Sequence, residues 1–261
     1  MENPDIAPNA ARCRFRRIVV KVGSNVLTRA DGTLDTDRMA ALADQIAALH
    51  RAGVEVIVVS SGAVAAGRGV IAAGHRLDAV SARQLYSAVG QVKLIRRYYE
   101  LFDARGIVCG QVLTTKQDFE TRRHYLNQRN SIRVMLENGV IPIVNENDTV
   151  ATHEIEIGDN DTLSAIVASM IGADLLILLS DIDGLYTDDP RANPDAEFIE
   201  TVEHLDESFL RMGKSTTGSG VGTGGMSTKL TAATIATASG ADMVIANSKD
   251  VRIIHRIIDG E

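Results

Sequence analysis

The sequence predicts an α/β protein built on a mainly parallel sheet, and three features of its 261 residues indicate this class. Short apolar runs rich in β-branched residues recur along the chain, and stretches with apolar residues at helical spacing separate them. The runs are hydrophobic almost throughout, as in strands that are buried on both faces. No Ser- or Pro-rich linker interrupts the alternation, so we expect one doubly wound domain.

The predicted strands are residues 17–22, 54–59, 107–113, 140–144, 175–179 and 243–246. The predicted helices are residues 35–51, 81–104, 122–137, 162–170 and 227–239. Residues 1–16 are predicted to form a flexible arm before a domain of residues 17–261. Two long stretches, 145–161 and 186–225, break the rhythm, and loops of that length inside a compact domain are usually functional.

Composition excludes several classes of protein. The formal net charge of -7 has the wrong sign for a protein that binds a nucleic-acid backbone. The two cysteines, Cys13 and Cys109, are far apart and lie in no Cys/His cluster, which argues against a disulfide framework or a zinc site. No signal peptide and no run of about 18 apolar residues is present. We therefore expect a cytoplasmic protein that binds neither nucleic acid nor membrane.

A lysine stands at the end of the first predicted strand. Lys21 is followed at once by Gly23 and Ser24, which places an ammonium group beside backbone N–H groups. Open α/β sheets bind ligands at the carboxyl ends of their strands, and this combination suits a phosphate. A solvated lysine before a turn glycine is the alternative. The chain holds six lysines among its 27 Lys and Arg residues, so a lysine here does not come from a lysine-rich background.

The second predicted strand ends in the small residues SSGAVAAG, which include Ser61 and Gly62. Small residues at this place let a backbone approach a ligand closely, although a tight strand-to-helix turn would look the same. The fourth strand leads into a loop crowded with carboxylates and amides. Asn160 or Asp161 could be the N-cap of the next helix. Asp148 and Asp159 lack that explanation, so we expect them to receive a substrate ammonium or to organise lysines.

A glycine-rich run over residues 218–229 enters the helix predicted at 227–239. Its glycines fit the spacing G-x-G-x-x-G, but no strand precedes them, which disfavours a dinucleotide-binding fold. Ser227, Thr228 and Lys229 in the first helical turn would form a phosphate cradle with the backbone amides. A flexible linker is the alternative. Two lysines, Lys21 and Lys229, in phosphate-binding settings favour phosphoryl transfer, which needs positioning and local positive charge.

These residues resemble the amino acid kinase family. The resemblance extends over about residues 17–259 through the segments VVKVGSNVLT, VSSGAVAAGR, QLYSAVGQ, IPIVNENDTVATHEIEIGDNDTLSA, LLSDIDGLYTDDPR and GTGGMSTKL. Within the family, the long NEND…GDND stretch and the GTGGM loop are the specific motifs, and they are similar to those of the branch that phosphorylates the side-chain carboxylate of glutamate with ATP, the first step of proline synthesis. The resemblance implies a three-layer αβα sandwich with both substrates at the carboxyl edge of the sheet.

The resemblance also implies roles for individual residues. Lys21 and Lys229 would stabilise the transferring phosphoryl group, and Asp159 would hold the two lysines in place. The residues that match the glutamate site are Ser61, Gly62, Asp148 and Asn160. The residues that match the nucleotide site are Lys21, Gly23, Ser180, Asp181, Thr223, Gly224, Gly225, Met226, Ser227, Thr228 and Lys229. Mg²⁺ would travel with the phosphates, and no protein ligand for it is implied.

Other interpretations stay open. Kinases of aspartate, acetylglutamate or a nucleoside monophosphate share the strand-end motifs, and a noncatalytic nucleotide or amino-acid sensor is the alternative outside the enzymes. Asp148 favours an acceptor with an unmodified α-ammonium group, since an N-acetyl group or a phosphate needs no carboxylate. The resemblance further implies a homo-oligomer inhibited by proline. The chain has no room for the PUA domain that many members carry, and it ends about where the family continues into a last short strand.

Overall fold

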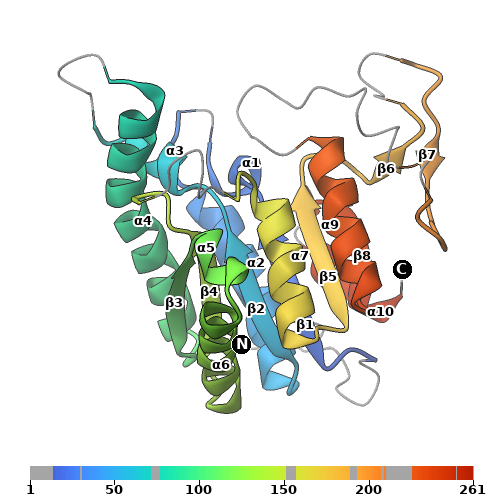
Figure 1. Cartoon of the computed structure of the whole chain (residues 1–261), viewed down its shortest axis with the longest axis horizontal. Coiled ribbons are helices and arrows are strands. Elements are labelled where there is room, and N and C mark those ends of the chain that lie inside the picture. Colours follow the sequence, from blue (N-terminus) through green and yellow to red (C-terminus); the bar gives the residue numbers. More distant parts are fainter. Residues whose placement is uncertain are drawn as a thin grey trace.

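The computed structural model describes residues 14–29, 31–71, 77–150, 157–188, 193–206, 209, 225–250 and 252–260. Its elements in chain order are β1 (Arg17–Val22), α1 (Ser24–Leu27), α2 (Thr36–Arg51), β2 (Glu55–Ser60), α3 (Ala63–Arg68), α4 (Ala79–Asp103), β3 (Cys109–Thr114), α5 (Gln117–Glu120), α6 (Arg122–Glu137), β4 (Ile141–Glu146), α7 (Asn160–Ile171), β5 (Leu175–Ser180), β6 (Leu185–Tyr186), β7 (Phe198–Ile199), α9 (Met226–Ala238), β8 (Asp242–Asn247) and α10 (Ile253–Asp259) (Figure 1).

Six strands form one parallel sheet in the order β3-β4-β2-β1-β5-β8. Strand β1 lies in the interior, hydrogen-bonded to β2 on one side and to β5 on the other. The chain crosses the sheet in one direction from β1 to β2 and in the opposite direction from β4 to β5. Such a reversal creates the crevice where doubly wound sheets bind ligands. The predicted mainly parallel α/β sheet is confirmed.

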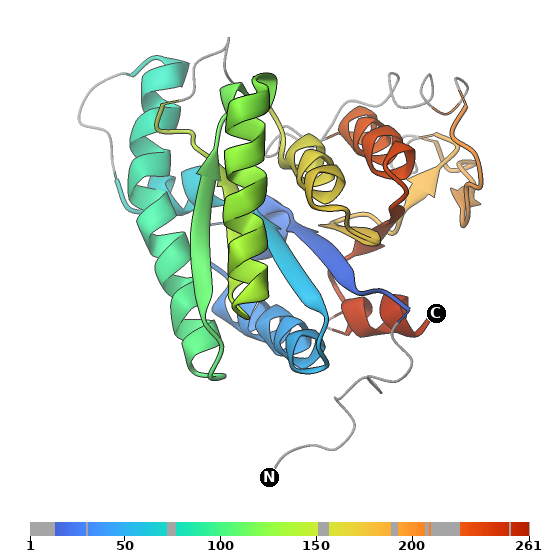
Figure 2. The same ribbon diagram turned by 60° about the horizontal axis from the view of Figure 1, so that its bottom comes forward.

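Helices cover both faces of the sheet. Figure 2 shows α7 and α9 on one side and α2 and α10 on the other. Alternate strand residues point to opposite layers, because successive side chains of a strand face opposite ways. In β1, Ile18 and Val20 join the core with α2 and α10, whereas Val19 joins the core with α7 and α9. Lys21 has the same parity as Val19 and so faces the α7 and α9 layer.

The predicted elements agree closely with the observed ones where the sequence signal is long and periodic. Strand β1 and helix α6 have the predicted bounds, and the other predicted strands and helices differ by at most two residues at each end. The prediction missed the short helices α1, α3 and α5, the helix α10 and the antiparallel β6–β7 pair. Elements of two to seven residues carry little periodicity, since their stability comes from tertiary packing.

The predicted N-terminal arm lies mostly outside the described residues, and its end belongs to the packed domain. Phe15 is buried in the core. The backbone N–H of Arg16 donates to Asp174 Oδ2 at 2.7 Å. Residues 15 and 16 are therefore not part of a flexible arm, which corrects that boundary. No helix among the described residues is long and apolar enough to cross a membrane.

Helix α3 packs against α4 at an unusually short distance. Each helix contributes a glycine to the contact. A Cβ atom on Gly90 would lie 1.7 Å from the carbonyl oxygen of Ala63, and one on Gly67 would lie 1.8 Å from that of Tyr86. Only glycine allows the two backbones to approach this closely. The contact fixes α4 against the segment that follows β2.

Replacing Gly90 with alanine is expected to destabilise the protein. In an ordinary helix the same change stabilises by about 1 kcal/mol, since glycine has the lower helix propensity. Here the added methyl group would overlap backbone atoms of α3, and overpacking of this kind costs about 1–3 kcal/mol. The melting temperature of Gly90→Ala should fall below that of the wild type in a thermal unfolding experiment. A rise in melting temperature would show that the two helices separate easily.

Candidate active site

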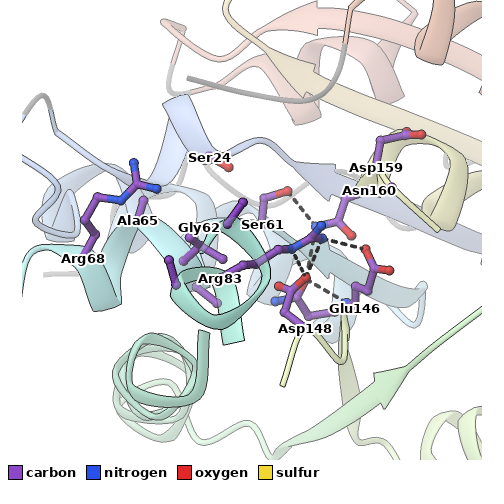
Figure 3. Close-up of a pocket in the computed structure, with 16 residues that line it drawn as sticks. Ser24, Ser61, Gly62, Ala65, Arg68, Arg83, Glu146, Asp148, Asp159 and Asn160 are labelled. Atoms are coloured by element: carbon purple, nitrogen blue, oxygen red, sulfur yellow. Dashed lines mark hydrogen bonds and ion pairs between the residues drawn. The ribbon is translucent and has the colours of Figure 1, made fainter. Parts of the chain in front are cut away.

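A cavity of about 380 Å³ opens at the carboxyl ends of the strands. Its walls come from the ends of β2 and β4, the segment around α3, the first turns of α4 and the start of α7 (Figure 3). All four residues predicted to bind the acceptor line it: Ser61, Gly62, Asp148 and Asn160. Ser61 and Asn160, 99 positions apart in the sequence, meet in this site, where Asn160 Nδ2 donates to Ser61 Oγ at 2.8 Å.

Two buried lysines share one carboxylate in the layer next to this cavity. Lys21 Nζ lies 2.6 Å from Asp161 Oδ1, and Lys229 Nζ lies 3.0 Å from Asp161 Oδ2. The first contact is an ion pair without the alignment of a hydrogen bond, and the second is a hydrogen bond. The three side chains are 10%, 5% and 1% exposed for Lys21, Lys229 and Asp161. These ion pairs link strand β1, helix α7 and helix α9.

The pKa of Asp161 lies below its ordinary value of 3.8. Burial acts to raise this pKa, but Lys21 and Lys229 together outweigh it. The carboxylate is therefore ionised near neutral pH, and the Lys21–Asp161–Lys229 triad carries a formal charge of +1. A buried cluster with surplus positive charge is costly unless an anion joins it. The triad is consequently suited to bind a phosphate group.

The prediction that Asp159 holds the two lysines is wrong, because Asp161 does so. Asp159 is the N-cap of α7, and its side chain accepts hydrogen bonds from the N–H and the Oγ1 of Thr162 at 2.7 and 2.8 Å. The predicted alternatives for that cap, Asn160 and Asp161, lie inside the helix instead. A cap at position 159 turns Asp161 towards the sheet, where Lys21 ends β1. The helix start, which the sequence leaves uncertain by two residues, decides the assignment.

Three side-chain amides, two of which line the acceptor cavity, are connected by hydrogen bonds. Asn145 Nδ2 donates to Gln91 Oε1 at 2.9 Å, and Asn160 Nδ2 donates to Asn145 Oδ1 at 3.1 Å. Gln91 and Asn145 are both buried. Asn160 Oδ1 is buried and has no hydrogen-bond partner among the described residues. The sequence analysis missed Gln91, which looks there like one polar residue of an amphipathic helix.

An arginine that the sequence analysis also missed reaches Asp148 from α4. Arg83 Nε donates to Asp148 Oδ1 at 2.8 Å, and its Nη2 lies 2.6 Å from the same oxygen and 3.4 Å from Glu146 Oε2 (Figure 3). Burial raises the pKa of Asp148, and the Arg83 guanidinium lowers it in part. Burial likewise raises the pKa of Glu146. The acceptor end of the cavity therefore holds two carboxylates and one paired guanidinium.

The predicted nucleotide residues lie at the ends of β1 and β5 and at the start of α9. Gly23 donates its N–H to the Leu179 carbonyl at 3.2 Å, and a Cβ there would lie 3.6 Å from Lys21 Nζ. Asp181 accepts from Asn25 Nδ2 at 3.4 Å, and Ser180 Oγ donates to Asp181 Oδ1 at 3.2 Å.

At the start of α9, Gly225 is the N-cap and Met226, Ser227, Thr228 and Lys229 form the first turn. Thr228 Oγ1 lies 3.0 Å from Asp161 Oδ2 and 2.8 Å from the Gly225 carbonyl. Thr223 and Gly224 lie outside the described residues. The first turn of α9 is thus joined to the triad through both Lys229 and Thr228.

Comparison with known proteins agrees with this architecture. The profile of the amino acid kinase family matches residues 16–247. The chain belongs to the amino acid kinase family. Two solved structures share the amino acid kinase fold: UMP kinase from Ureaplasma parvum, with a TM-score of 0.62 at 19% identity, and UMP kinase from Bacillus anthracis, with a TM-score of 0.65 at 17% identity. Each alignment covers 95% of this chain, with 96% and 93% of the solved chains.

Curated relatives within the amino acid kinases are more similar in sequence. Glutamate 5-kinase of Bacteroides thetaiotaomicron is 55% identical over 92% of this chain and 66% of its own length. Glutamate 5-kinase of Shewanella halifaxensis is 47% identical over 96% of this chain and 67% of its own length. That of Neisseria gonorrhoeae is 47% identical over 90% of this chain and 79% of its own length. The chain thus spans about two thirds of the length of the first two relatives.

Exchanging each of the two aspartates of α7 for asparagine should separate their roles. Asp161→Asn leaves two buried lysines without a carboxylate, which is expected to cost about 3–5 kcal/mol of unfolding free energy. Asp159→Asn is the matched control, since asparagine caps a helix about as well as aspartate and the loss should stay near or below 1 kcal/mol. Urea unfolding at pH 7 measures both variants.

The pH dependence adds a second reading of the same pair. The folded pKa of Asp161 is lowered, so its contribution is fully present above the unfolded value of 3.8 and is lost as the pH falls through the folded pKa. The difference in unfolding free energy between the wild type and Asp161→Asn should therefore become smaller only in strong acid. Equal losses in the two variants at pH 7 would return the role of bridging carboxylate to Asp159.

Proposed function

We propose that the chain catalyses ATP-dependent phosphorylation of the γ-carboxylate of L-glutamate, giving γ-glutamyl phosphate, the first step of proline synthesis. The observation that carries this proposal is the buried Lys21–Asp161–Lys229 triad beside an acceptor cavity that contains Asp148. The names of the similar amino acid kinases, glutamate 5-kinases at 47–55% identity, support glutamate as the acceptor. The reaction is the transfer of a phosphoryl group from ATP to a carboxylate oxygen.

The triad supplies the electrostatic part of the reaction. Charge on the transferring phosphoryl group spreads over its oxygens, and cations fixed in a water-poor site stabilise it strongly. Lys21 and Lys229 provide two such cations, and Asp161 fixes the distance between them through one carboxylate. The acceptor oxygen is already ionised at neutral pH, so no general base is needed. The protein's task is to align this carboxylate with the phosphate of ATP.

The cavity itself recognises the amino group of the acceptor. Asp148 is buried and paired with Arg83, and its carboxylate oxygens can accept hydrogen bonds from an α-ammonium group. Asn160 Oδ1, which has no partner among the described residues, is a second acceptor near Ser61. A ligand ammonium would satisfy buried acceptors that are otherwise incompletely bonded. Ser61 and Gly62 contribute the wall formed by the end of β2.

The nucleotide would lie against Gly23, the pair Ser180 and Asp181, and the first turn of α9. Thr223 and Gly224 stay predictions of the same site. Among the described residues no group of three or more His, Cys, Asp or Glu side chains is arranged to hold a metal ion. That Mg²⁺ is carried by the phosphates of ATP and neutralises part of their charge stays a prediction from the resemblance. A homo-oligomer, inhibition by proline and a cytoplasmic location likewise stay predictions.

Two other functions are less well supported. A nucleoside monophosphate or an N-acetylated acceptor carries no α-ammonium, and Asp148 with Glu146 would repel a phosphate at that end of the cavity. A noncatalytic sensor has no need of two buried lysines on one aspartate, because binding a nucleotide requires fewer desolvated charges. Aspartate is the nearest competitor, since it shares the α-ammonium and differs by one methylene. Such a small difference gives only about 10- to 200-fold discrimination.

A panel of acceptors tests the proposed function. The purified chain with MgATP should release ADP with L-glutamate well above the rate without acceptor. The kcat/KM values for L-aspartate, N-acetyl-L-glutamate and UMP should be lower than the value for L-glutamate. ADP release with one of these acceptors and none with glutamate would assign the site to that acceptor instead. No ADP release with any of them, together with measurable ATP binding, would favour the sensor.

Replacing Lys229 with alanine should lower kcat much more than it raises the KM for glutamate. The lysine is expected to bind the phosphoryl group more strongly as charge develops in the transition state than in the ground state, so the expected loss in kcat is about 100- to 1,000-fold. Lys93→Ala is the control, because Lys93 is an exposed lysine on α4. Steady-state kinetics with both substrates varied measures the effect. Equal losses in kcat and in glutamate affinity would mean that Lys229 binds the ground state.

A further inference from the structure

The acceptor end of the cavity has an unusual charge pattern. Three of the residues that line it carry carboxylates, Glu146, Asp148 and Asp159, and two carry guanidinium groups, Arg68 and Arg83. Arg68 is exposed and lies over the ring of Tyr86 at 5.5 Å. Figure 3 shows Arg83, in contrast, pointing into the cluster of Asp148, Glu146 and Asn160. Arg83 is therefore the cation that lines the cavity in contact with Asp148 and Glu146.

An α-amino acid brings two opposite charges on one carbon atom. Asp148 can accept the ammonium, but the adjacent carboxylate would then enter a region that already holds Asp148 and Glu146. Burying an anion beside other anions is strongly unfavourable unless a cation pairs with it. A guanidinium is well suited to this role, since its planar N–H groups match the two oxygens of a carboxylate.

The position of Arg83 meets this requirement. Its guanidinium contacts Asp148 directly, at 2.6 Å from Nη2 to Oδ1, so the two charges of the site are adjacent in the same way as the two charges of an amino acid. The Arg83 side chain is 30% exposed, whereas those of Asp148 and Glu146 are 10% and 4% exposed. One face of the arginine therefore borders the cavity while the other is held by the carboxylates. The holding contacts fix its orientation before a ligand arrives.

Resting on the proposed function, we propose that Arg83 is a specificity residue that binds the α-carboxylate of the acceptor, while Asp148 receives the α-ammonium. The two residues form a clamp for a zwitterion. The clamp selects an α-amino acid over an acid that lacks either group, and it leaves the far carboxylate of the acceptor directed at the lysine triad.

Three ligands separate the two halves of the clamp. L-Glutamate has both charged groups, 4-aminobutyrate lacks the α-carboxylate, and glutarate lacks the α-ammonium. Each analogue is measured as an acceptor and as an inhibitor of glutamate phosphorylation, so its affinity is obtained whether or not it is phosphorylated. For the wild type we expect both analogues to bind about 10- to 100-fold more weakly than glutamate, the usual effect of losing a hydrogen bond to a charged group.

The variants are expected to show crossed effects. Arg83→Met should weaken glutamate and glutarate by about 10- to 100-fold, mainly in KM, and should change 4-aminobutyrate by less than about threefold. Asp148→Asn should weaken glutamate and 4-aminobutyrate but spare glutarate. Arg97→Met is the matched control, because Arg97 lies on the same helix, has a side chain 33% exposed and pairs with Glu100 at 3.1 Å. It should change none of the three affinities.

A purely structural role for Arg83 would give a different result. If Arg83→Met weakened 4-aminobutyrate as much as glutamate, the arginine would act only by holding Asp148, and the inference would be overturned. Arg83→Lys retains the charge and should recover part of the glutamate affinity. Should Arg83→Met fail to fold, the ratio of glutamate to 4-aminobutyrate affinity in Arg83→Lys decides. Absence of glutamate turnover in the wild type would instead overturn the proposed function itself.

Discussion

The ion cluster of Lys21, Asp161 and Lys229 is the constraint on which the rest of the site depends. Its members come from β1, α7 and α9, and all three are buried, so none can find a substitute partner in water. Two buried ammonium groups require a carboxylate between them, since an unpaired buried charge costs several kcal/mol. This requirement fixes the rotation of α7, brings the first turn of α9 to the carboxyl end of β1, and leaves one surplus positive charge for an anion.

The site contains two groups of charged side chains, the lysine triad and the charged residues of the acceptor cavity. The triad supplies surplus positive charge, and Asp148 with Glu146 outnumbers Arg83 in the cavity. A protein with a net charge of -7 does not attract two anionic substrates by its overall field. Local cations must do so, and burial strengthens their effect because little water screens them. In the proposed reaction this arrangement would orient the acceptor, with its ammonium at Asp148 and its side-chain carboxylate towards the lysines.

Parts of this arrangement could be predicted from the sequence, and parts could not. The six strands were predictable because burial on both faces leaves continuous apolar runs. Lys21 could be predicted because it stands at the end of such a run just before Gly23, and Lys229 because it lies in the first turn of a helix that follows a glycine-rich run. Asp161 was confused with Asp159 because both flank one helix start, and a shift of two residues changes which carboxylate faces the sheet. Gln91 lies in the QLYSAVGQ segment, but no local pattern assigns a site role to it or to Arg83, since these roles arise from contacts with residues 54 and 65 positions away.

The close contact between α3 and α4 also affects the acceptor cavity. The glycine contact at Gly67 and Gly90 fixes where α4 passes the cavity, and α4 supplies both Arg83 to Asp148 and Gln91 to Asn145. The triad, in contrast, is built from β1, α7 and α9. Helix α7 thus serves both groups, with Asn160 in the acceptor cavity and Asp161 in the triad, whereas α4 serves the cavity and α9 serves the triad. Side chains on α4 can then change the acceptor while the lysines and their aspartate stay in place, which is how one fold serves several substrates.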